Sequence, residues 1–160
     1  MIELYHGSNI EIDKIDLKKG RLGKDFGQGF YLSENKSQAL KMAQTAVDRE
    51  ETGYPTVTTY LFDESLLHTH DALNVKIFEG YSKEWAQFVF LNRANKTESQ
   101  AHDFDVVYGP IANDKVGVQI RRFMMKYIDI DQLVKELEFI HPTYQYFFGT
   151  ERAISYLTKK

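Results

Sequence analysis

The chain has 160 residues and a formal net charge of −3, and hydrophobic residues make up 42% and charged residues 27% of it. This composition excludes a disordered or fibrous chain, and the small negative charge excludes an overall basic protein that binds nucleic acid nonspecifically. The sequence has no cysteine, no apolar run near the roughly 18 residues of a membrane span and no signal-peptide pattern in MIELYHGSNI, so we expect one cytoplasmic, unexported domain over residues 1–160.

The first half of the chain predicts short strands around a glycine-rich loop, and one helix. Residues 18–28 are dominated by glycine and charge, which is typical of a loop. A helix is indicated after this loop because alanine, leucine and valine recur at helical spacing behind a serine that can cap them. The expected strands are residues 2–5, 29–32 and 54–62, and the expected helix is residues 37–51, capped by Ser37.

The second half mixes strands and helices without the regular alternation of a doubly wound parallel sheet. The expected strands are residues 72–78, 104–108 and 144–148, the second of them ending at Gly109-Pro110. The expected helices are residues 82–92, residues 128–137 and a short terminal helix, started by Ser82, Asp129 and Thr150 respectively. The chain is therefore predicted to be an α+β domain.

The segment Tyr5-His6-Gly7-Ser8 places an imidazole, a bare backbone and a hydroxyl together where the first expected strand ends in a turn. A glycine allows a ligand to approach the backbone, whose N–H and C=O can then pair with an amide such as a carboxamide. An ordinary strand-to-turn corner has the same kind of sequence, so this segment alone decides nothing.

Residues 25–32, DFGQGFYL, form the second candidate segment. Two glycines precede an aromatic strand, which indicates that the backbone passes close to a flat group, and we assign Gly29 to the cofactor site for this reason. Alternation along a strand puts Phe30 and Tyr31 on opposite faces, so that one ring belongs to the core while the other can stack on a planar heterocycle. The glycines are not a dinucleotide fingerprint, because a strand rather than a helix follows them.

Together, YHGS and DFGQGFYL resemble the motifs of the ADP-ribosyltransferases of the histidine–tyrosine class, which includes the poly(ADP-ribose) polymerases and diphtheria toxin. More narrowly, the chain is similar to a family of short single-domain bacterial proteins that share two further stretches, here residues 105–116 and 145–153. The resemblance implies two mostly antiparallel sheets around an NAD cleft, with helices around them and NAD as the substrate.

The resemblance also implies roles for the matching residues. His6 would bond a hydroxyl of the adenine-side ribose, while Gly7 and Ser8 would hold the nicotinamide carboxamide. Tyr31 would stack on the nicotinamide ring. Arg21, in the loop before the second motif, would pair with the pyrophosphate as a bidentate donor.

The third catalytic position departs from the polymerase pattern. The polymerases carry a glutamate at the start of a late strand, and the matching segment here is Tyr144-Gln145-Tyr146. The neutral amide of Gln145 can bond a ribose hydroxyl but cannot serve as a base, so single transfer rather than chain elongation is expected. Glu151 is the alternative carboxylate, although an exposed acid in the first turn of a helix is its ordinary interpretation. We therefore expect a catalytic set of His6, Tyr31 and Gln145.

Two further groups are weaker candidates. His68 and His70 have the spacing of two metal ligands on one strand face, but no third ligand stands near them, so a surface loop is favoured and no metal is expected. Asp105, Asn113 and Asp114 flank a Gly-Pro turn, where such residues ordinarily serve turn geometry. That loop is still a candidate for contacts with the acceptor.

We therefore expect an NAD-dependent mono-ADP-ribosyltransferase that moves ADP-ribose to a protein or nucleic-acid acceptor and releases nicotinamide. Two alternatives stay open: hydrolysis of NAD to free ADP-ribose, and a non-catalytic module that binds ADP-ribose or a nucleotide. By analogy with small stand-alone members of such families, the chain would act as a toxin or phage-defence effector, with an antitoxin as a partner and no membrane contact.

Overall fold

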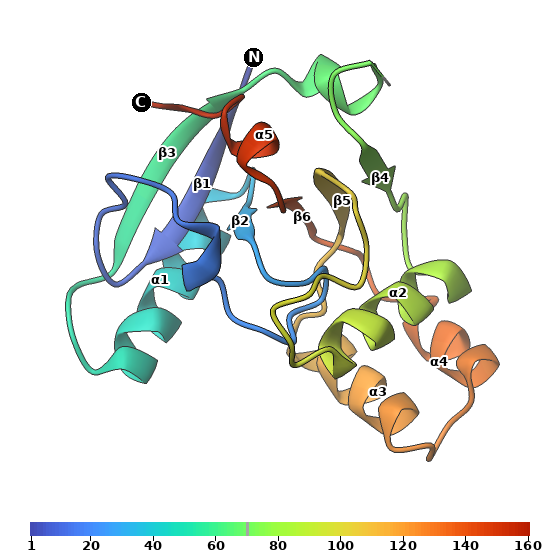
Figure 1. Ribbon diagram of the computed structural model, residues 1–160. Helices are drawn as coiled ribbons and strands as arrows, with labels where there is room; N and C mark the ends of the chain where they lie inside the picture. Colours follow the sequence, from blue (N-terminus) through green and yellow to red (C-terminus); the bar gives the residue numbers. More distant parts are fainter. Residues whose placement is uncertain (70) are drawn as a thin grey trace.

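The computed structural model describes residues 1–69 and 71–160, and within them the chain forms two mostly antiparallel sheets and five α-helices (Figure 1). The fold is α+β, as the sequence predicts. The strands are β1 (Ile2–Ser8), β2 (Phe30–Leu32), β3 (Thr56–Phe62), β4 (Val75–Ile77), β5 (Val106–Pro110), β6 (Tyr144–Phe148) and β7 (Thr158–Lys159). The α-helices are α1 (Lys36–Glu50), α2 (Lys83–Ala94), α3 (Asp114–Met124), α4 (Ile130–Leu137) and α5 (Glu151–Ile154), and two short 3₁₀ helices cover Leu17–Lys19 and Glu64–Leu67.

The two sheets share an apolar core. The first sheet has the strand order β1-β3-β7 and is antiparallel throughout, whereas the second has the order β2-β6-β5-β4 and is antiparallel except between β4 and β5. Because side chains alternate along a strand, each sheet turns one apolar set toward the other. Large buried members of this core are Leu4, Phe30, Leu32, Tyr60, Phe62, Tyr146 and Phe148.

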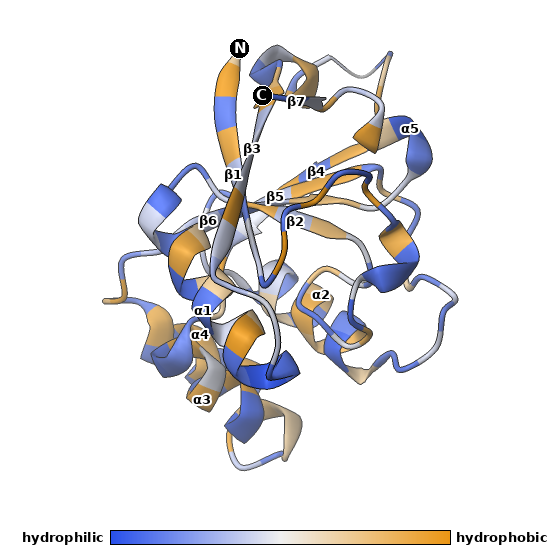
Figure 2. Cartoon of the chain, turned by 90° about the vertical axis from the view of Figure 1, so that its left-hand side faces the viewer, coloured by the Kyte–Doolittle hydropathy of each residue, from blue (hydrophilic) through white to orange (hydrophobic). Residues whose placement is uncertain are grey.

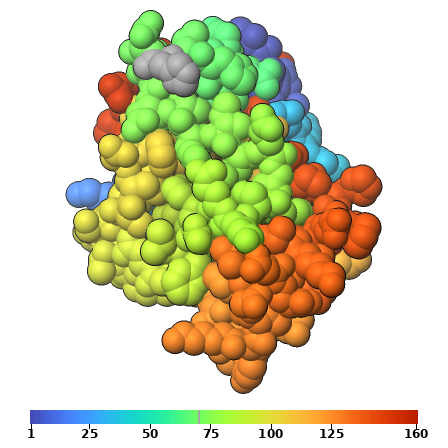
Figure 3. All heavy atoms as spheres, turned by 90° about the vertical axis from the view of Figure 1, so that its right-hand side faces the viewer, coloured from blue at the N-terminus to red at the C-terminus, as the bar shows by residue number. Residues whose placement is uncertain are grey.

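Helices cover the remaining faces. Helix α1 packs on the outer side of β1, and α2, α3 and α4 cover the face of the second sheet that points away from the first (Figure 1). Apolar stretches of the strands and of α2 are orange in Figure 2, and the orange atoms of α3 and α4 lie below the green atoms of β4 and α2 in Figure 3. This second core includes Phe26, Trp85, Val89, Val107, Ile120, Leu133 and Phe147. Of the helices described by the structure, none combines the length and apolar character needed to cross a membrane.

The structure corrects two expected strand ends. The segment His6-Gly7-Ser8, expected as a turn, lies inside β1, because pairing with β3 continues as far as Ser8. Gly109 and Pro110, expected to end a strand, are part of β5, because both pair with residues of β6. The expected strand 144–148 is confirmed as β6.

The sequence predicts where α2, α4 and α5 begin, but it does not predict helix α3. Ser82, Asp129 and Thr150 cap α2, α4 and α5 as expected. The first helix is capped by Asn35 rather than by Ser37, since the Asn35 side chain accepts a hydrogen bond from the third residue of α1. Helix α3 was not expected, although its apolar residues recur at helical spacing, because the preceding Gly-Pro pair favours an irregular turn.

Candidate functional site

The two sheets are joined at one short bridge, where the candidate site begins. The Tyr5 N–H donates to Ser33 O at 2.8 Å, and the Ser33 N–H donates to Tyr5 O at 3.0 Å. Beyond this bridge β1 continues alongside β3, while β2 continues alongside β6. We call the diverging segments, residues 6–8 of β1 and 30–31 of β2, the fork. Both sequence motifs meet there.

His6 spans the fork with its imidazole. Its Nδ1 lies 2.8 Å from Tyr31 O, and because a carbonyl can only accept, Nδ1 carries the proton. The ring also stacks on the Phe30 ring, with 4.2 Å between the centroids. Burial lowers the pKa of His6 to about 4. At neutral pH the imidazole is therefore uncharged, and its Nε2 is a hydrogen-bond acceptor.

Tyr31 is held by its hydroxyl and by the packing of its ring. Its hydroxyl accepts from the Phe26 N–H at 3.0 Å and donates to Gly27 O at 2.8 Å, so the ring is tied to the loop that precedes β2. The Phe147 ring packs against it edge to face at 5.2 Å. Phe30 belongs to the core between the sheets, whereas Tyr31 packs on the core beneath the helices. The expected placement of these two rings on opposite faces is confirmed.

Position 7 must be a glycine because β1 packs closely against α1. A Cβ on Gly7 would overlap Ala39 O and lie 2.7 Å from Ala43 N, so only glycine lets β1 approach α1 this closely. Its backbone nevertheless faces the fork: Tyr5 directs its N–H and C=O at Ser33, and in an extended strand the residue two positions on directs its own groups the same way. One glycine thus meets the helix on one side and offers a donor and an acceptor at the fork.

Of the neighbouring motif residues, Gly29 serves packing, whereas Ser8 leaves a polar group available. A Cβ on Gly29 would overlap the Phe147 ring and lie 2.6 Å from Phe148 O, so this glycine serves the approach of the loop to β6. Ser8 is half-buried, and its hydroxyl donates a long hydrogen bond, 3.4 Å, to Asn9 Oδ1. Ser8 therefore keeps a polar group available at the end of β1.

Gln145 lies on the same face of the second sheet as Tyr31. Tyr31 pairs with Phe147 across the ladder, and Gln145 is two residues from Phe147 on the same strand. The Gln145 side chain is half-buried, and no residue in the described ranges hydrogen-bonds its amide. Glu151 lies beyond the other end of β6 as an exposed first-turn residue of α5. The structure thus places Gln145 on the Tyr31 face of the second sheet and His6 on the Tyr31 carbonyl, and it leaves Glu151 beyond the opposite end of β6.

The loop before β2 contributes one cation that sequence reasoning missed, Lys24, beside the expected Arg21. Lys24 lies with its ammonium 4.1 Å from the centroid of the Tyr31 ring. The pKa of Lys24 is lowered to about 8, mainly by burial and also by the charges of Arg21 and Arg49, against the opposing effect of Asp25. Arg21 is exposed, and Arg49 stands in the last turn of α1. Lys24 could have been identified from the sequence, because it directly precedes DFGQGFYL. Arg49 could not, because only folding brings it near this loop.

Asp25 fixes this loop to the helical layer. Its carboxylate accepts from Arg93 Nε at 2.7 Å and from the Ala112 N–H at 3.2 Å. The ring of His102 bonds Phe26 O at 2.7 Å from the same side. The backbone that carries Tyr31's hydroxyl partners is therefore anchored to α2 and to the segments on either side of β5.

The weaker sequence candidates take structural or peripheral places. Asp105 is buried and accepts from the Asn74 N–H at 2.8 Å and the Thr150 hydroxyl at 2.5 Å, and it pairs with Arg152. Asn113 caps α3. His68 is exposed at the end of a 3₁₀ helix, and its expected companion His70 lies outside the described residues. In residues 1–69 and 71–160 no three acidic or histidine side chains converge as a metal site would need.

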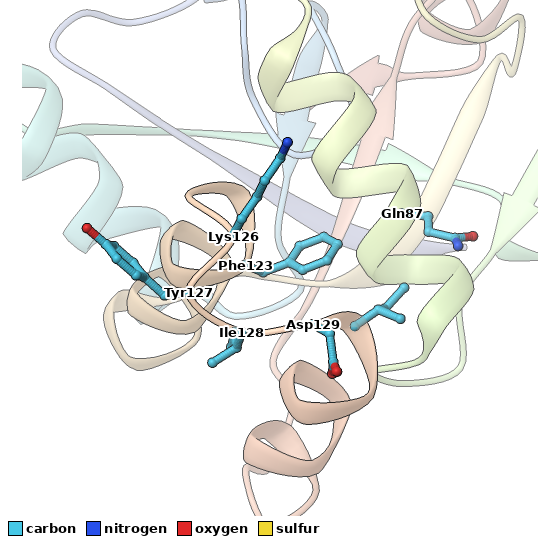
Figure 4. Close-up of a pocket in the computed structure, with 7 residues that line it drawn as sticks. Gln87, Phe123, Lys126, Tyr127, Ile128 and Asp129 are labelled. Carbon is cyan, nitrogen blue, oxygen red and sulfur yellow. The ribbon is translucent and has the colours of Figure 1, made fainter.

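A surface hollow of about 440 Å³ lies elsewhere, between α2 and the turn that joins α3 to α4 (Figure 4). Phe123, Tyr127 and Ile128 provide its apolar lining, and Lys126 and Asp129 stand at the same turn (Figure 4). None of its lining residues belongs to β1, β2 or β6. We take the fork rather than this hollow as the candidate site, because both sequence motifs meet at the fork.

Comparison with known proteins places the chain in a family without identifying its chemistry. A protein-family model described as "Protein of unknown function (DUF3990)" matches residues 2–158, which is nearly the whole chain. No curated protein and no solved structure matches the chain.

Proposed function

We propose that this chain, which belongs to the DUF3990 family of proteins of unknown function, is an NAD-dependent ADP-ribosyltransferase that moves ADP-ribose to a macromolecular acceptor and releases nicotinamide. The observation that carries the proposal is the fork, where His6 bonds the backbone carbonyl of Tyr31 beside the free backbone edge of Gly7. The two mostly antiparallel sheets agree with the ADP-ribosyltransferase core that the motifs resemble.

The nicotinamide half of NAD fits the edge of β1. A carboxamide has one N–H₂ donor and one C=O acceptor, which match the C=O and N–H that Gly7 directs at the fork. Ser8 adds a hydroxyl at the same edge. Tyr31 offers a ring for stacking, an interaction worth roughly 1–3 kcal/mol per base in other proteins. Three neighbouring features thus recognise one flat amide-bearing ring.

The adenine-side ribose fits the acceptor of His6. Because Tyr31 O holds Nδ1 as the protonated nitrogen, Nε2 is free to accept from a ribose hydroxyl. The low pKa of His6 keeps this acceptor available throughout the neutral range. Arg21 and Arg49 place positive charge near the same loop, which suits the diphosphate that joins the two nucleosides.

The reaction breaks the bond between ribose C1′ and the nicotinamide nitrogen. The bonding electron pair leaves with nicotinamide, which departs neutral, and the ribose becomes oxocarbenium-like. A nucleophile of the acceptor then bonds C1′ and loses its proton to solvent. Gln145 lies on the Tyr31 face, where its amide can hold a ribose hydroxyl and so orient this step. Without a carboxylate at this position, we expect single transfer.

Calorimetry with NAD and with free nicotinamide tests the site, using the Tyr31→Ala and Tyr31→Phe variants. Alanine should weaken NAD binding by roughly 1–3 kcal/mol, since the stacking face is lost. Phenylalanine should retain most of that affinity but unfold more easily, because the hydroxyl anchors Phe26 and Gly27. Failure of the intact protein to bind either ligand at millimolar concentration would refute the proposal.

Labelled NAD then separates the reaction classes. Incubation with a bacterial lysate, followed by protease and nuclease digestion, should leave the label attached to one class of macromolecule if ADP-ribose is transferred. Release of free ADP-ribose would instead make the protein an NAD glycohydrolase. Binding without nicotinamide release would make it a nucleotide-binding module, an outcome in keeping with the glutamine at position 145.

A further inference from the structure

Lys24 occupies the ring face that the proposed function reserves for nicotinamide. Its ammonium lies 4.1 Å from the centroid of the Tyr31 ring, within the range of a cation–π contact. Phe26 and Phe147, both fully buried, pack against Tyr31 from the core. A ligand that stacks on Tyr31 must therefore arrive from the side that Lys24 covers.

The surroundings of this ammonium hold it weakly. Asp25, the adjacent carboxylate, is paired with Arg93 and the Ala112 N–H, and no carboxylate in the described part of the chain lies within ion-pair distance of Lys24. Besides Asp25, the charged groups that act on Lys24 are Arg21 and Arg49, and both repel it. His6, which is also within its electrostatic range, is neutral above about pH 4. An unpaired cation among cations gains from meeting an anion.

We propose that Lys24 covers Tyr31 only in the empty protein, and that the cationic nicotinamide ring of NAD displaces it toward the diphosphate of the same dinucleotide. One cation on Tyr31 is exchanged for another, so the ring keeps its cation–π partner. Lys24 meanwhile gains an anion that no residue in 1–69 and 71–160 supplies. This inference rests on the proposed function and makes Lys24 a specificity-determining residue.

The exchange distinguishes the dinucleotide from its product. Free nicotinamide is neutral and brings no phosphate, so it must remove the ammonium from Tyr31 without giving it a new partner. NAD supplies both a replacement cation and a negative group. Lys24 should therefore oppose the binding of nicotinamide and favour the binding of NAD, and removing its charge should shift the two affinities in opposite directions.

The test compares Lys24→Met with the intact protein and with Lys19→Met, a control at an exposed lysine of the same loop. Methionine keeps the length and the apolar stem of lysine but has no charge. By calorimetry at pH 7, Lys24→Met should bind nicotinamide about fivefold more tightly and NAD about fivefold more weakly than the intact protein. Lys19→Met should change neither affinity, and thermal unfolding checks that all three proteins are folded.

The pH provides a second readout on the intact protein. Loss of the Lys24 proton near pH 8 should increase nicotinamide affinity between pH 7 and 9, and Lys24→Met should lack this increase. Shifts of both affinities in the same direction, or unchanged affinities in Lys24→Met, would overturn the exchange while leaving the NAD site intact. If the intact protein binds neither ligand, the proposed function fails first, and the exchange fails with it.

Discussion

The two ends of β6 use similar polar residues for different purposes. Near its carboxyl end, the buried carboxylate of Asp105 accepts from the backbone, from a hydroxyl and from a guanidinium, and so locks the start of α5 to β5. At its amino end, Gln145 leaves its amide without a partner among the described residues, on the face shared with Tyr31. One end satisfies its polar groups internally, and the other leaves them available.

Whether its polar groups are paired distinguishes a structural corner from a binding site more clearly than residue type does. A buried polar group that is fully hydrogen-bonded stabilises the fold and has nothing left for a ligand. Half-buried groups with unused hydrogen-bonding capacity, such as the Gly7 backbone and His6 Nε2, cost stability unless water or a ligand pairs with them. The motifs name the residues of the proposed site, and the structure adds that the Gly7 backbone and His6 Nε2 have hydrogen-bonding capacity to spare among the described residues.

Acid should lower the free energy of unfolding through His6 at the fork and through Asp105 near the carboxyl end of β6, in separate pH ranges. This is the largest effect we expect. Because the folded-state pKa of His6 is about 4 rather than 6.5, the unfolded chain binds a proton first as the pH falls. The free energy of unfolding should therefore decrease by up to about 3 kcal/mol between pH 6.5 and 4. Asp105, whose pKa is lowered by Arg152 and Thr150 against the effect of burial, should retain its contribution until the pH falls below about 3.8.

Urea unfolding of the intact protein and of a His6→Asn variant, measured across this pH series, tests whether His6 causes the loss of stability between pH 6.5 and 4. The variant should lose less stability than the intact protein between pH 6.5 and 4, and both should lose stability below it. Part of the decrease should persist in the variant, because burial also lowers the pKa of His102. Parallel curves for the two proteins would show that His6 is not held neutral by the fold.

Loss of the Gln145 amide should affect turnover and leave stability nearly unchanged. If the amide positions the ribose, Gln145→Ala should lower nicotinamide release by about 10²-fold, the scale on which a lost positioning contact can act. NAD affinity should change much less. Gln145→Glu should keep or raise NAD cleavage, because a carboxylate there stabilises developing positive charge. Gln87→Ala, an exposed glutamine on α2, is the matched control and should release nicotinamide at the normal rate.

The smallest effect is expected at Glu151. This side chain is exposed in the first turn of α5, so Glu151→Ala should cost only about 0.3–1 kcal/mol of stability and leave nicotinamide release unchanged. The measurement is thermal unfolding beside the same release assay. An inactive Glu151→Ala together with an active Gln145→Ala would reverse the comparison between the two ends of β6.

Local patterns predicted β1 to β6 and most helix starts, because these depend on neighbouring residues, but they did not predict the two-residue strand β7. A run of aromatic residues indicated β6, and single capping side chains marked α2, α4 and α5. Local reasoning missed α3, whose helical spacing follows a Gly-Pro pair, and it ended β1 too early, because the pairing partner of His6 lies 52 residues away on β3. Pairing over such distances is not visible in a local pattern.

By itself, the sequence determined the α+β class and the two motifs, since composition, periodicity and glycine placement are properties of the chain. The tertiary structure alone decided that Gly7 serves the approach of α1, that His6 donates to Tyr31 O, and that Lys24 covers the Tyr31 ring. Each of these is a contact between groups that only the folded chain brings together. The chemistry of a residue belongs to the sequence, but whether its polar groups are left unpaired is settled by packing.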